Sequence, residues 1–229
     1  MNYKVFLIVI LLLGTKAGIS QGFINLNFEN AKFVSDPGSG YYPASVYANK
    51  AIPGWTAYAG ESPLSEIFSN TVSLSGGMIS IIGNNNSLGF PPVEGQYYIM
   101  LVGANYAGSL NTAGIGQTGT IPLNAATLTF WGNFPTDGVS FSGQNLTTFQ
   151  IGSTPFYNIY SANISSYAGQ TGQLLFTTHP GRDNYLDNIQ FSNLPIPEPG
   201  ALALLVAGGL LGAWRGRRAI CRGGGVGLP

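Results

Sequence analysis

The C-terminal end of the chain carries an apolar run that strongly limits what the rest of it can fold into. Residues 200–214 contain no charge and lie between a proline-rich break and three arginines. The flanking residues are Pro197, Glu198 and Pro199 before the run, and Arg215, Arg217 and Arg218 after it. As a helix the run rises about 1.5 Å per residue, roughly 22 Å in all, which is short of the ~30 Å hydrocarbon core. We expect it to span only a locally thinned membrane, with its arginines on the cytoplasmic side and the bulk of the chain outside.

This tail resembles the sorting signal of the PEP-CTERM family of exported bacterial proteins. The Pro-Glu-Pro triplet at 197–199, the apolar run and the basic cluster occur in that family's order. The resemblance implies that residues 195–229 are recognised by an exosortase, a membrane-embedded enzyme that cuts near the triplet and hands the exported domain to the envelope or matrix. Contact with the inner membrane is then transient. An ordinary tail anchor is the alternative, and residues 219–229 are either a genuine extension or a misread reading frame.

The N-terminal end has the pattern of a secretory signal peptide. Lys4 precedes a ten-residue apolar run at 5–14, which is too short for an anchor, and small residues follow. We therefore predict cleavage after Ser20 and a single domain at 21–194.

The predicted domain is acidic and has no means of internal cross-linking. Its three basic residues against eight acidic ones give a net charge of −5, which makes nucleic acid a poor partner. The only cysteine, Cys221, lies in the tail, so no internal disulfide is possible. The core alone, or the core with a metal ion, must hold the domain together.

Short apolar segments separated by glycine, asparagine and proline turns predict an all-β domain. Alternation with period two, as in Leu128 and Phe130, places one face of a strand inward. Strands at regular spacing under turn signals indicate a sandwich. The predicted strands are 23–28, 67–69, 78–82, 97–102, 109–117, 126–131, 138–141, 147–151, 157–164, 174–177 and 185–191.

The order of the motifs in this domain resembles that of the galactose-binding-domain-like jelly roll, an architecture of many carbohydrate-binding modules. The matching segments are NLNFE at 25–29, IPGWT at 52–56, GQYYIML at 95–101, IGQT at 115–118, LTFW at 128–131 and YLDNIQF at 185–191. The resemblance implies a jelly-roll β-sandwich, adjacent first and last strands, and a structural calcium ion between them. The positions that match the calcium ligands are Glu29 and Asp187.

The alternation of side chains along a strand does not place these two carboxylates where a shared calcium ion would need them. It places Glu29 on the face opposite to Phe28, which would require a bulge or the end of the strand. It places Asp187 on the same face as Ile189 and Phe191, where a charge needs a partner. A carboxylate that binds backbone N–H groups in a turn is the alternative to a calcium ligand.

Carbohydrate contact is expected from aromatic rings and amides in or beside loops, because sugar rings stack on flat apolar faces and their hydroxyls bind polar groups. The candidates are Tyr41, Tyr42, Trp55, Tyr58, Asn105 and Tyr106. For Trp55, burial in the core is the favoured interpretation.

No catalytic pattern stands out in the sequence. The single histidine, His179, lies in a Pro-Gly loop, and no pair of carboxylates is singled out by its spacing. We therefore expect a non-enzymatic structural or adhesive protein that contacts polysaccharide. A polysaccharide hydrolase or lyase and a protein–protein matrix module are the alternatives.

Overall fold

The computed structural model describes residues 22–41, 43–71, 77–86, 91–106, 109–133 and 138–196, apart from the side chains of 105, 106, 109 and 110. The predicted signal peptide, the Pro-Glu-Pro triplet and the basic cluster lie outside the described residues. Within the described part, no helix has the length and apolar character needed to cross a membrane.

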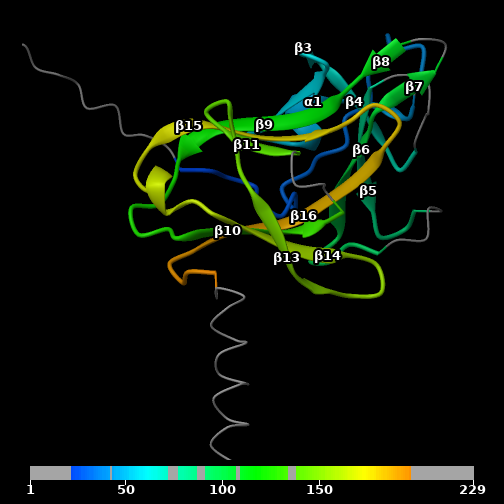
Figure 1. The fold of residues 1–229 in the computed structure, drawn as a ribbon. Coiled ribbons are helices and arrows are strands. Elements are labelled where there is room, and N and C mark those ends of the chain that lie inside the picture. The colour runs from blue at the N-terminus through cyan, green and yellow to red at the C-terminus, as the bar shows by residue number, and fades with distance from the viewer. Residues whose placement is uncertain are drawn as a thin grey trace, which may run out of the picture.

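Two β-sheets that face each other form the domain, as the sandwich prediction expects (Figure 1). The strands are β1 (Ser45–Tyr47), β2 (Thr56–Ala59), β3 (Ser62–Leu64), β4 (Glu66–Ser69), β5 (Met78–Gly83), β6 (Tyr97–Val102), β7 (Ala104–Tyr106), β8 (Ser109–Asn111), β9 (Ala113–Thr120), β10 (Thr127–Gly132), β11 (Val139–Phe141), β12 (Gln144–Asn145), β13 (Thr148–Ser153), β14 (Asn158–Asn163), β15 (Thr171–Thr178) and β16 (Asp183–Ser192). Helix α1 (Ala48–Ala51) and the 3-10 turn η1 (Ser165–Tyr167) are each a single turn.

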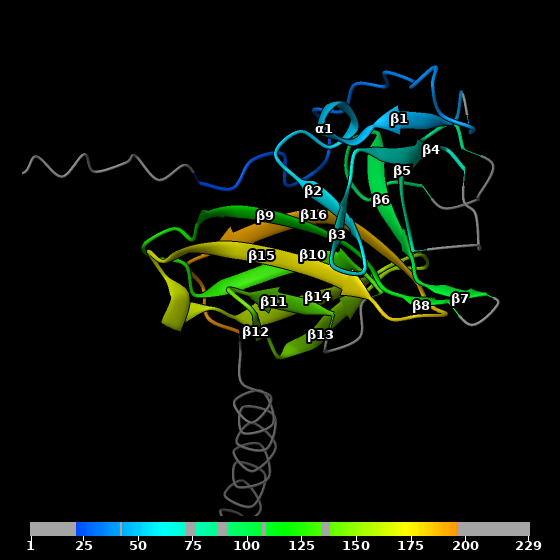
Figure 2. The same ribbon diagram turned by 90° about the horizontal axis from the view of Figure 1, so that it is seen from above.

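The eight-stranded sheet has the order β1-β4-β5-β6-β16-β10-β14-β13, and the six-stranded sheet has the order β12-β11-β15-β9-β2-β3. A separate hairpin pairs β7 with β8. Strands β4 and β5 run parallel, and the other pairs of these strands are antiparallel. Figure 2 looks onto the six-stranded sheet, with β9 lying between β2 and β15.

Apolar side chains from both sheets fill the space between them. Leu128 and Phe130 of β10 are fully buried, which confirms the inward face predicted by their alternation. Phe130 packs edge-on against Phe176 of β15, with ring centroids 5.2 Å apart. Burial of this apolar surface is the main force that holds the sheets together, since the chain's only cysteine lies outside the domain.

A second apolar cluster covers the outer face of the eight-stranded sheet. Every residue of β5 is buried, because Ile79 and Ile81 face the main core whereas Met78 and Ile82 face this second cluster. Tyr157 packs edge-on against Tyr98 of this cluster, with centroids 6.3 Å apart, and its hydroxyl donates to the Pro91 carbonyl in the segment before β6 at 2.6 Å. The eight-stranded sheet is therefore buried on both faces in this region.

The predicted first strand, 23–28, is wrong. The backbone is left-handed at Asn25 (φ 51°) and Phe28 (φ 61°), which an extended strand does not allow. The segment nevertheless lies beside the last strand: the Ile189 N–H donates to the Leu26 carbonyl at 3.0 Å. The adjacency of the two ends of the domain is thus present without the strand itself.

Several short elements were not predicted. The strands β1, β2, β3, β7 and β12 were missed, and the predicted strand 109–117 is divided between β8 and β9. Their sequences explain the failure. Thr56–Ala59, for example, reads TAYA and lacks the alternation of large apolar and polar residues that marks a half-buried strand.

Removal of the ring that joins the sheets should test the core. We expect Phe130→Ala to lower the free energy of unfolding by about 3–5 kcal/mol, because it leaves a cavity between β10 and β15. Phe149→Ala, at a ring that is 52% exposed, should change it by less than about 1 kcal/mol. Urea denaturation followed by tryptophan fluorescence measures both, and equal losses would contradict this account of the core.

Candidate functional site

Among the residues that the structure describes, the predicted carbohydrate contacts are not brought together. Tyr41 is 65% exposed and packs edge-on against Phe68 of β4, with centroids 5.3 Å apart. Tyr42 lies outside the described residues, and so do the side chains of Asn105 and Tyr106 on β7.

Trp55 is a core residue, as the favoured interpretation expected. It is 4% exposed, its ring lies between Phe28 and Phe176, and its indole N–H donates to the Asn25 carbonyl at 3.0 Å. Its edge lines a hollow of about 270 Å³ beside Tyr47. A sugar could not stack on this ring, because its faces are occupied by other aromatic side chains.

Tyr58 projects from the outer face of the six-stranded sheet and is half-buried. Its hydroxyl accepts a hydrogen bond of 3.1 Å from the side-chain amide of Gln173 on β15. The two residues lie on strands that flank β9, so the bond crosses that strand.

Glu29 and Asp187 converge on a single segment of backbone, the approach to β6. One oxygen of Glu29 accepts from the N–H groups of Gln96 and Tyr97, at 2.8 and 2.9 Å. The left-handed turn at Phe28 explains how Glu29 reaches this segment, which alternation in a regular strand would not allow. Gly95 is left-handed with φ 65°, which favours glycine, and a Cβ on it would lie 2.3 Å from the Glu29 carboxyl carbon and displace that carboxylate.

Asp187 binds the same segment from the other side. Its Oδ2 accepts from the N–H groups of Val93 and Glu94, at 2.9 and 3.2 Å, and its Oδ1 accepts from Asn188 at 2.7 Å. These bonds match the alternative in which a carboxylate binds backbone N–H groups in a turn.

The predicted shared face of Asp187 and Ile189 is wrong, because a β-bulge intervenes. Thr129 pairs with Gln190 but Trp131 pairs with Asp187, and Asn188 is left-handed with φ 48°. The extra residue sends both Leu186 and Ile189 into the main core. Asp187 therefore lies on the opposite face, beneath the approach to β6.

The Asp187 carboxyl is fully buried, and this burial raises its pKa to about 7. The N–H groups of Glu94, Val93 and Asn188 act in the opposite direction by stabilising the anion, while the Glu29 charge raises the pKa further. In the folded protein Asp187 is therefore mostly protonated below about pH 7 and ionised above it.

The two carboxylates fit a calcium ion only in part. Calcium takes six to eight oxygen ligands, and the described residues contain no group of three or more His, Cys, Asp and Glu side chains able to hold a metal. Backbone carbonyls would have to complete the coordination shell. In favour of an ion, two carboxylates of like charge act on one segment, and one of them is buried.

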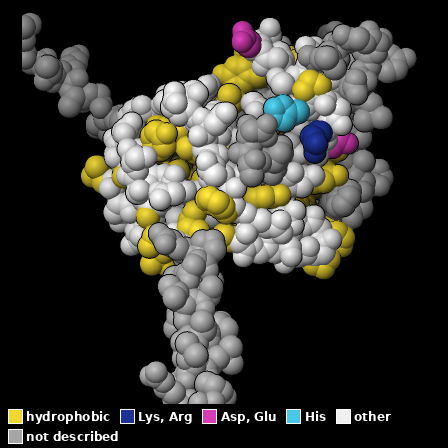
Figure 3. Space-filling view, viewed as in Figure 1, with side chains coloured by type: hydrophobic (Ala, Val, Ile, Leu, Met, Phe, Trp, Pro, Cys, Tyr) yellow, Lys and Arg dark blue, Asp and Glu magenta, His cyan; other side chains and the backbone are white. Residues whose placement is uncertain are grey.

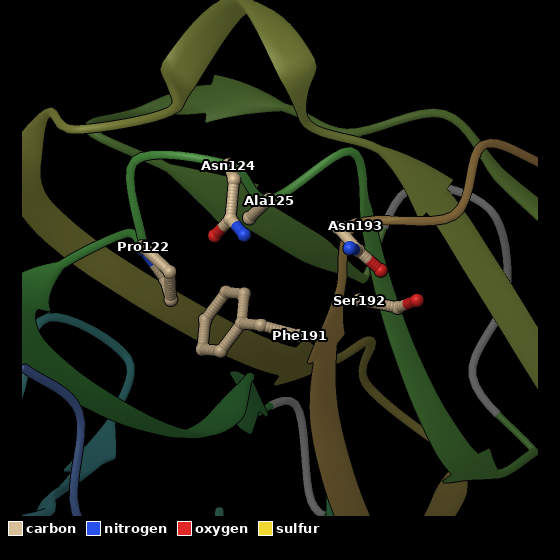
Figure 4. Close-up of a pocket in the computed structure, with 6 residues that line it drawn as sticks. All are labelled: Pro122, Asn124, Ala125, Phe191, Ser192 and Asn193. Carbon is tan, nitrogen blue, oxygen red and sulfur yellow. The ribbon is translucent and has the colours of Figure 1, made fainter.

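A pocket of about 280 Å³ opens at the end of the sandwich, where β9 leads into β10 and β16 ends (Figure 4). Its lining combines one aromatic ring with amide and hydroxyl groups and no charge. The lining residues are Pro122, Asn124, Ala125, Phe191, Ser192 and Asn193. In Figure 4 the side chain of Asn124 extends toward the ring of Phe191.

Local hydrogen bonds fix the shape of this pocket. The Ala125 N–H donates to the Pro122 carbonyl at 3.0 Å, which closes the turn that carries Asn124. The Ala126 N–H donates to the Ser192 carbonyl at 2.7 Å, which joins that turn to the end of β16. Phe191 stacks on Phe23, with centroids 5.3 Å apart, so the ring is held from behind.

Two amide groups of the pocket remain available to a ligand, whereas the Ser192 hydroxyl oxygen accepts from the Leu194 N–H at 3.0 Å. In the described ranges, the side-chain amides of Asn124 and Asn193 make no hydrogen bond, and both residues are exposed. Paired amides beside a fixed aromatic ring can donate to and accept from hydroxyl groups while the ring contacts the apolar face of a sugar. The sequence prediction missed these residues. A turn signal, Pro-Leu-Asn after a strand, is the only pattern that could have drawn attention to Asn124.

Comparison with known proteins finds no family model that matches the chain, and no curated protein or solved structure that is similar to it.

The pKa of Asp187 predicts an unusual pH dependence of stability. Because the folded-state pKa lies above the unfolded value of about 3.9, the folded state binds more protons between about pH 4 and 7. In the presence of a chelator, we expect the free energy of unfolding to fall across this range as the pH rises, by on the order of 1–3 kcal/mol. Asp187→Asn should flatten the slope, whereas Glu61→Gln, at an exposed side chain, should keep it.

Calcium is tested in the same melting experiments. An ion bound between Glu29 and Asp187 would hold Asp187 ionised, so millimolar calcium should raise the melting temperature at about pH 8 and abolish the slope. Identical melts with calcium and with chelator would remove the ion and leave the carboxylates as anchors of backbone N–H groups.

Proposed function

We propose that this chain is a non-catalytic, exported bacterial protein whose jelly-roll domain contacts neutral carbohydrate in the cell envelope or extracellular matrix. Its N-terminal segment acts as a cleavable secretory signal. Its tail acts as an exosortase sorting signal, through Pro197, Glu198 and Pro199 and the arginines that follow the apolar run. The support for export is the order of these two end segments in the sequence.

The pocket at the end of the sandwich is the observation that best supports carbohydrate contact. Its polar groups are amides and a hydroxyl, which bind the hydroxyls of a sugar without requiring a charge on it. Its aromatic ring, Phe191, is fixed in place by Phe23. An uncharged lining of this kind favours a neutral sugar over an anionic one, because no described cation faces the pocket.

The scarcity of charge on the surface agrees with this choice of ligand. Charged side chains are sparse and scattered on the face shown in Figure 3. The whole predicted domain carries a net charge of −5, which disfavours polyanions. A neutral polysaccharide avoids this repulsion.

Glycan binding tests the proposed pocket. We expect the full chain, solubilised in a detergent without a sugar head group, to bind neutral oligosaccharides on a glycan array. Asn124→Ala and Asn193→Ala should each weaken binding by about fivefold or more, because each removes hydrogen bonds to the sugar hydroxyls. Asn30→Ala, at another exposed asparagine, is the matched control. Absence of binding would contradict carbohydrate contact, and release of shortened glycans would contradict a non-catalytic role.

Sorting is tested separately by substitutions in the triplet. In cells that carry an exosortase, we expect Pro197→Ala with Pro199→Ala to leave an uncleaved form in the membrane, because the two prolines break regular structure before the apolar run. Pro155→Ala, at an exposed proline of the domain, should leave processing intact. An immunoblot of membrane and released fractions distinguishes these results, and normal processing of the double variant would refute the sorting role.

A further inference from the structure

On the outer face of the six-stranded sheet, two glycines of β9, Gly114 and Gly116, form a floor between the side chains of β2 and those of β15. Tyr58 of β2 pairs with Gly114 of β9, and Gly114 pairs with Thr177 of β15. One step along, Thr56 pairs with Gly116, and Gly116 pairs with Leu175. Because side chains alternate along a strand, all of these positions lie on the same face, and both positions on β9 lack a side chain.

The neighbouring side chains use the space that the glycines leave. A Cβ on Gly116 would lie 3.0 Å from the amide nitrogen of Gln173 and 3.3 Å from a methyl group of Leu175. The Gln173 amide thus lies close above the backbone of β9. A larger residue at position 116 would displace it.

Tyr58 must lie across this floor to reach Gln173. The two residues stand on strands that flank β9, and adjacent strands are about 4.8 Å apart. The amide of Gln173 nevertheless donates to the Tyr58 hydroxyl at 3.1 Å. The tyrosine side chain is therefore directed along the face and held by its hydroxyl, while the residue remains partly exposed to solvent.

The chemistry of this face is uniform. Around Tyr58 and Gln173, the outward positions on β2, β9, β15 and β11 carry hydroxyl groups, a single leucine or, on β9, glycine, and none of them carries a charge. Apart from the glycines, these outward residues are Thr56, Thr118, Ser140, Leu175 and Thr177. On β3, the cross-strand partner of Tyr58 is the exposed Pro63. A flat aromatic side chain among hydroxyls and an amide suits a sugar ring, whereas the lack of further large apolar residues gives a protein partner little to bury.

We infer that this face binds an extended neutral polysaccharide, with Tyr58 as the stacking platform and Gln173 as the residue that positions it. The inference rests on the proposed function, but it assigns a second site, separate from the pocket at the end of the sandwich. Gly116 and Pro122 are six residues apart in the chain, and the residues from 116 to 120 belong to the extended strand β9. At about 3.3 Å per residue, the two sites lie roughly 15–20 Å apart along β9. A domain with two such sites could hold one long glycan at two points or join two glycans.

Affinity electrophoresis in gels that contain hydroxyethylcellulose, galactomannan or laminarin tests this inference. The full chain is used, in a detergent without a sugar head group, with alginate as an anionic comparison. We expect retardation by at least one neutral polymer and none by alginate. Tyr58→Ala should weaken the binding of that polymer about tenfold, and Tyr58→Phe should retain most of it, because the ring remains. Phe149→Ala, at an exposed aromatic residue on β13 of the other sheet, is the matched control.

The variants separate the failure of this inference from the failure of the proposed function. If Tyr58→Ala binds the polymer as well as the wild type does and melts at the same temperature, the face is not a binding site, and the pocket can still be judged by Asn124→Ala. If the wild-type chain is retarded by none of the neutral polymers, the polysaccharide surface is refuted, whatever short oligosaccharides the pocket binds. If Tyr58→Ala lowers the melting temperature, Tyr58→Phe decides, since a loss of binding equal to that of alanine would contradict stacking.

Discussion

The buried carboxylate of Asp187 is the interaction on which the arrangement around the last strand depends. It lies on β16, which pairs with both β6 and β10 and so stands at the centre of the eight-stranded sheet. Its hydrogen bonds hold the approach to β6, and Glu29 holds the same segment from the N-terminal side. A buried charge is costly unless it is compensated, and here backbone N–H groups from Val93, Glu94 and Asn188 offset only part of the cost, so the pKa of Asp187 stays raised. Three distant parts of the chain are fixed to one another as a result.

The same anchor explains how a domain without a disulfide orders long irregular segments. Apolar packing joins the two sheets, but it has no direction and does not by itself position a loop. Hydrogen bonds from carboxylates to successive N–H groups do position one, because each bond requires a particular distance and angle. The segment that they position also binds Tyr157 through Pro91, and the ring of Tyr157 packs against Tyr98 of the second apolar cluster.

Much of the fold could be predicted because most strands combine alternating apolar residues with strong turn signals. Leu128 and Phe130 are an example, since both are buried in the core as their period-two spacing predicts. The failures have local causes that a single sequence does not reveal. The bulge at Asn188 reverses the alternation that placed Asp187 with Ile189. Left-handed residues at Asn25 and Phe28 prevent the first strand, although the segment is rich in apolar residues.

The candidate sites were harder to predict, because they are made by pairs of residues far apart in the chain. Tyr58 was predicted as a contact from its own chemistry, but its partner Gln173 lies 115 residues away and has no distinguishing pattern. The pocket likewise joins a turn at Asn124 to the end of β16 at Asn193. Tyr58 was expected in or beside a loop but lies on β2, and only the pairing of the strands determines which residues meet.

Glycine in the middle of a strand requires a reason, because it weakens the strand relative to any residue that can pack a side chain. Strand β9 carries glycine at outward positions 114 and 116, between two strands with ordinary side chains. The loss of packing at these positions is offset only in part, by Gln173 and Leu175 lying over the floor. Close packing accounts for part of the need for glycine, because a Cβ on Gly114 would lie 2.9 Å from the Phe176 carbonyl oxygen. The absence of side chains at both positions also leaves room for Tyr58 to reach across β9 to Gln173. A ligand with broad, flat, uncharged rings is the kind of molecule that such a face accommodates, and this requirement links the cost in strand stability to the proposed function.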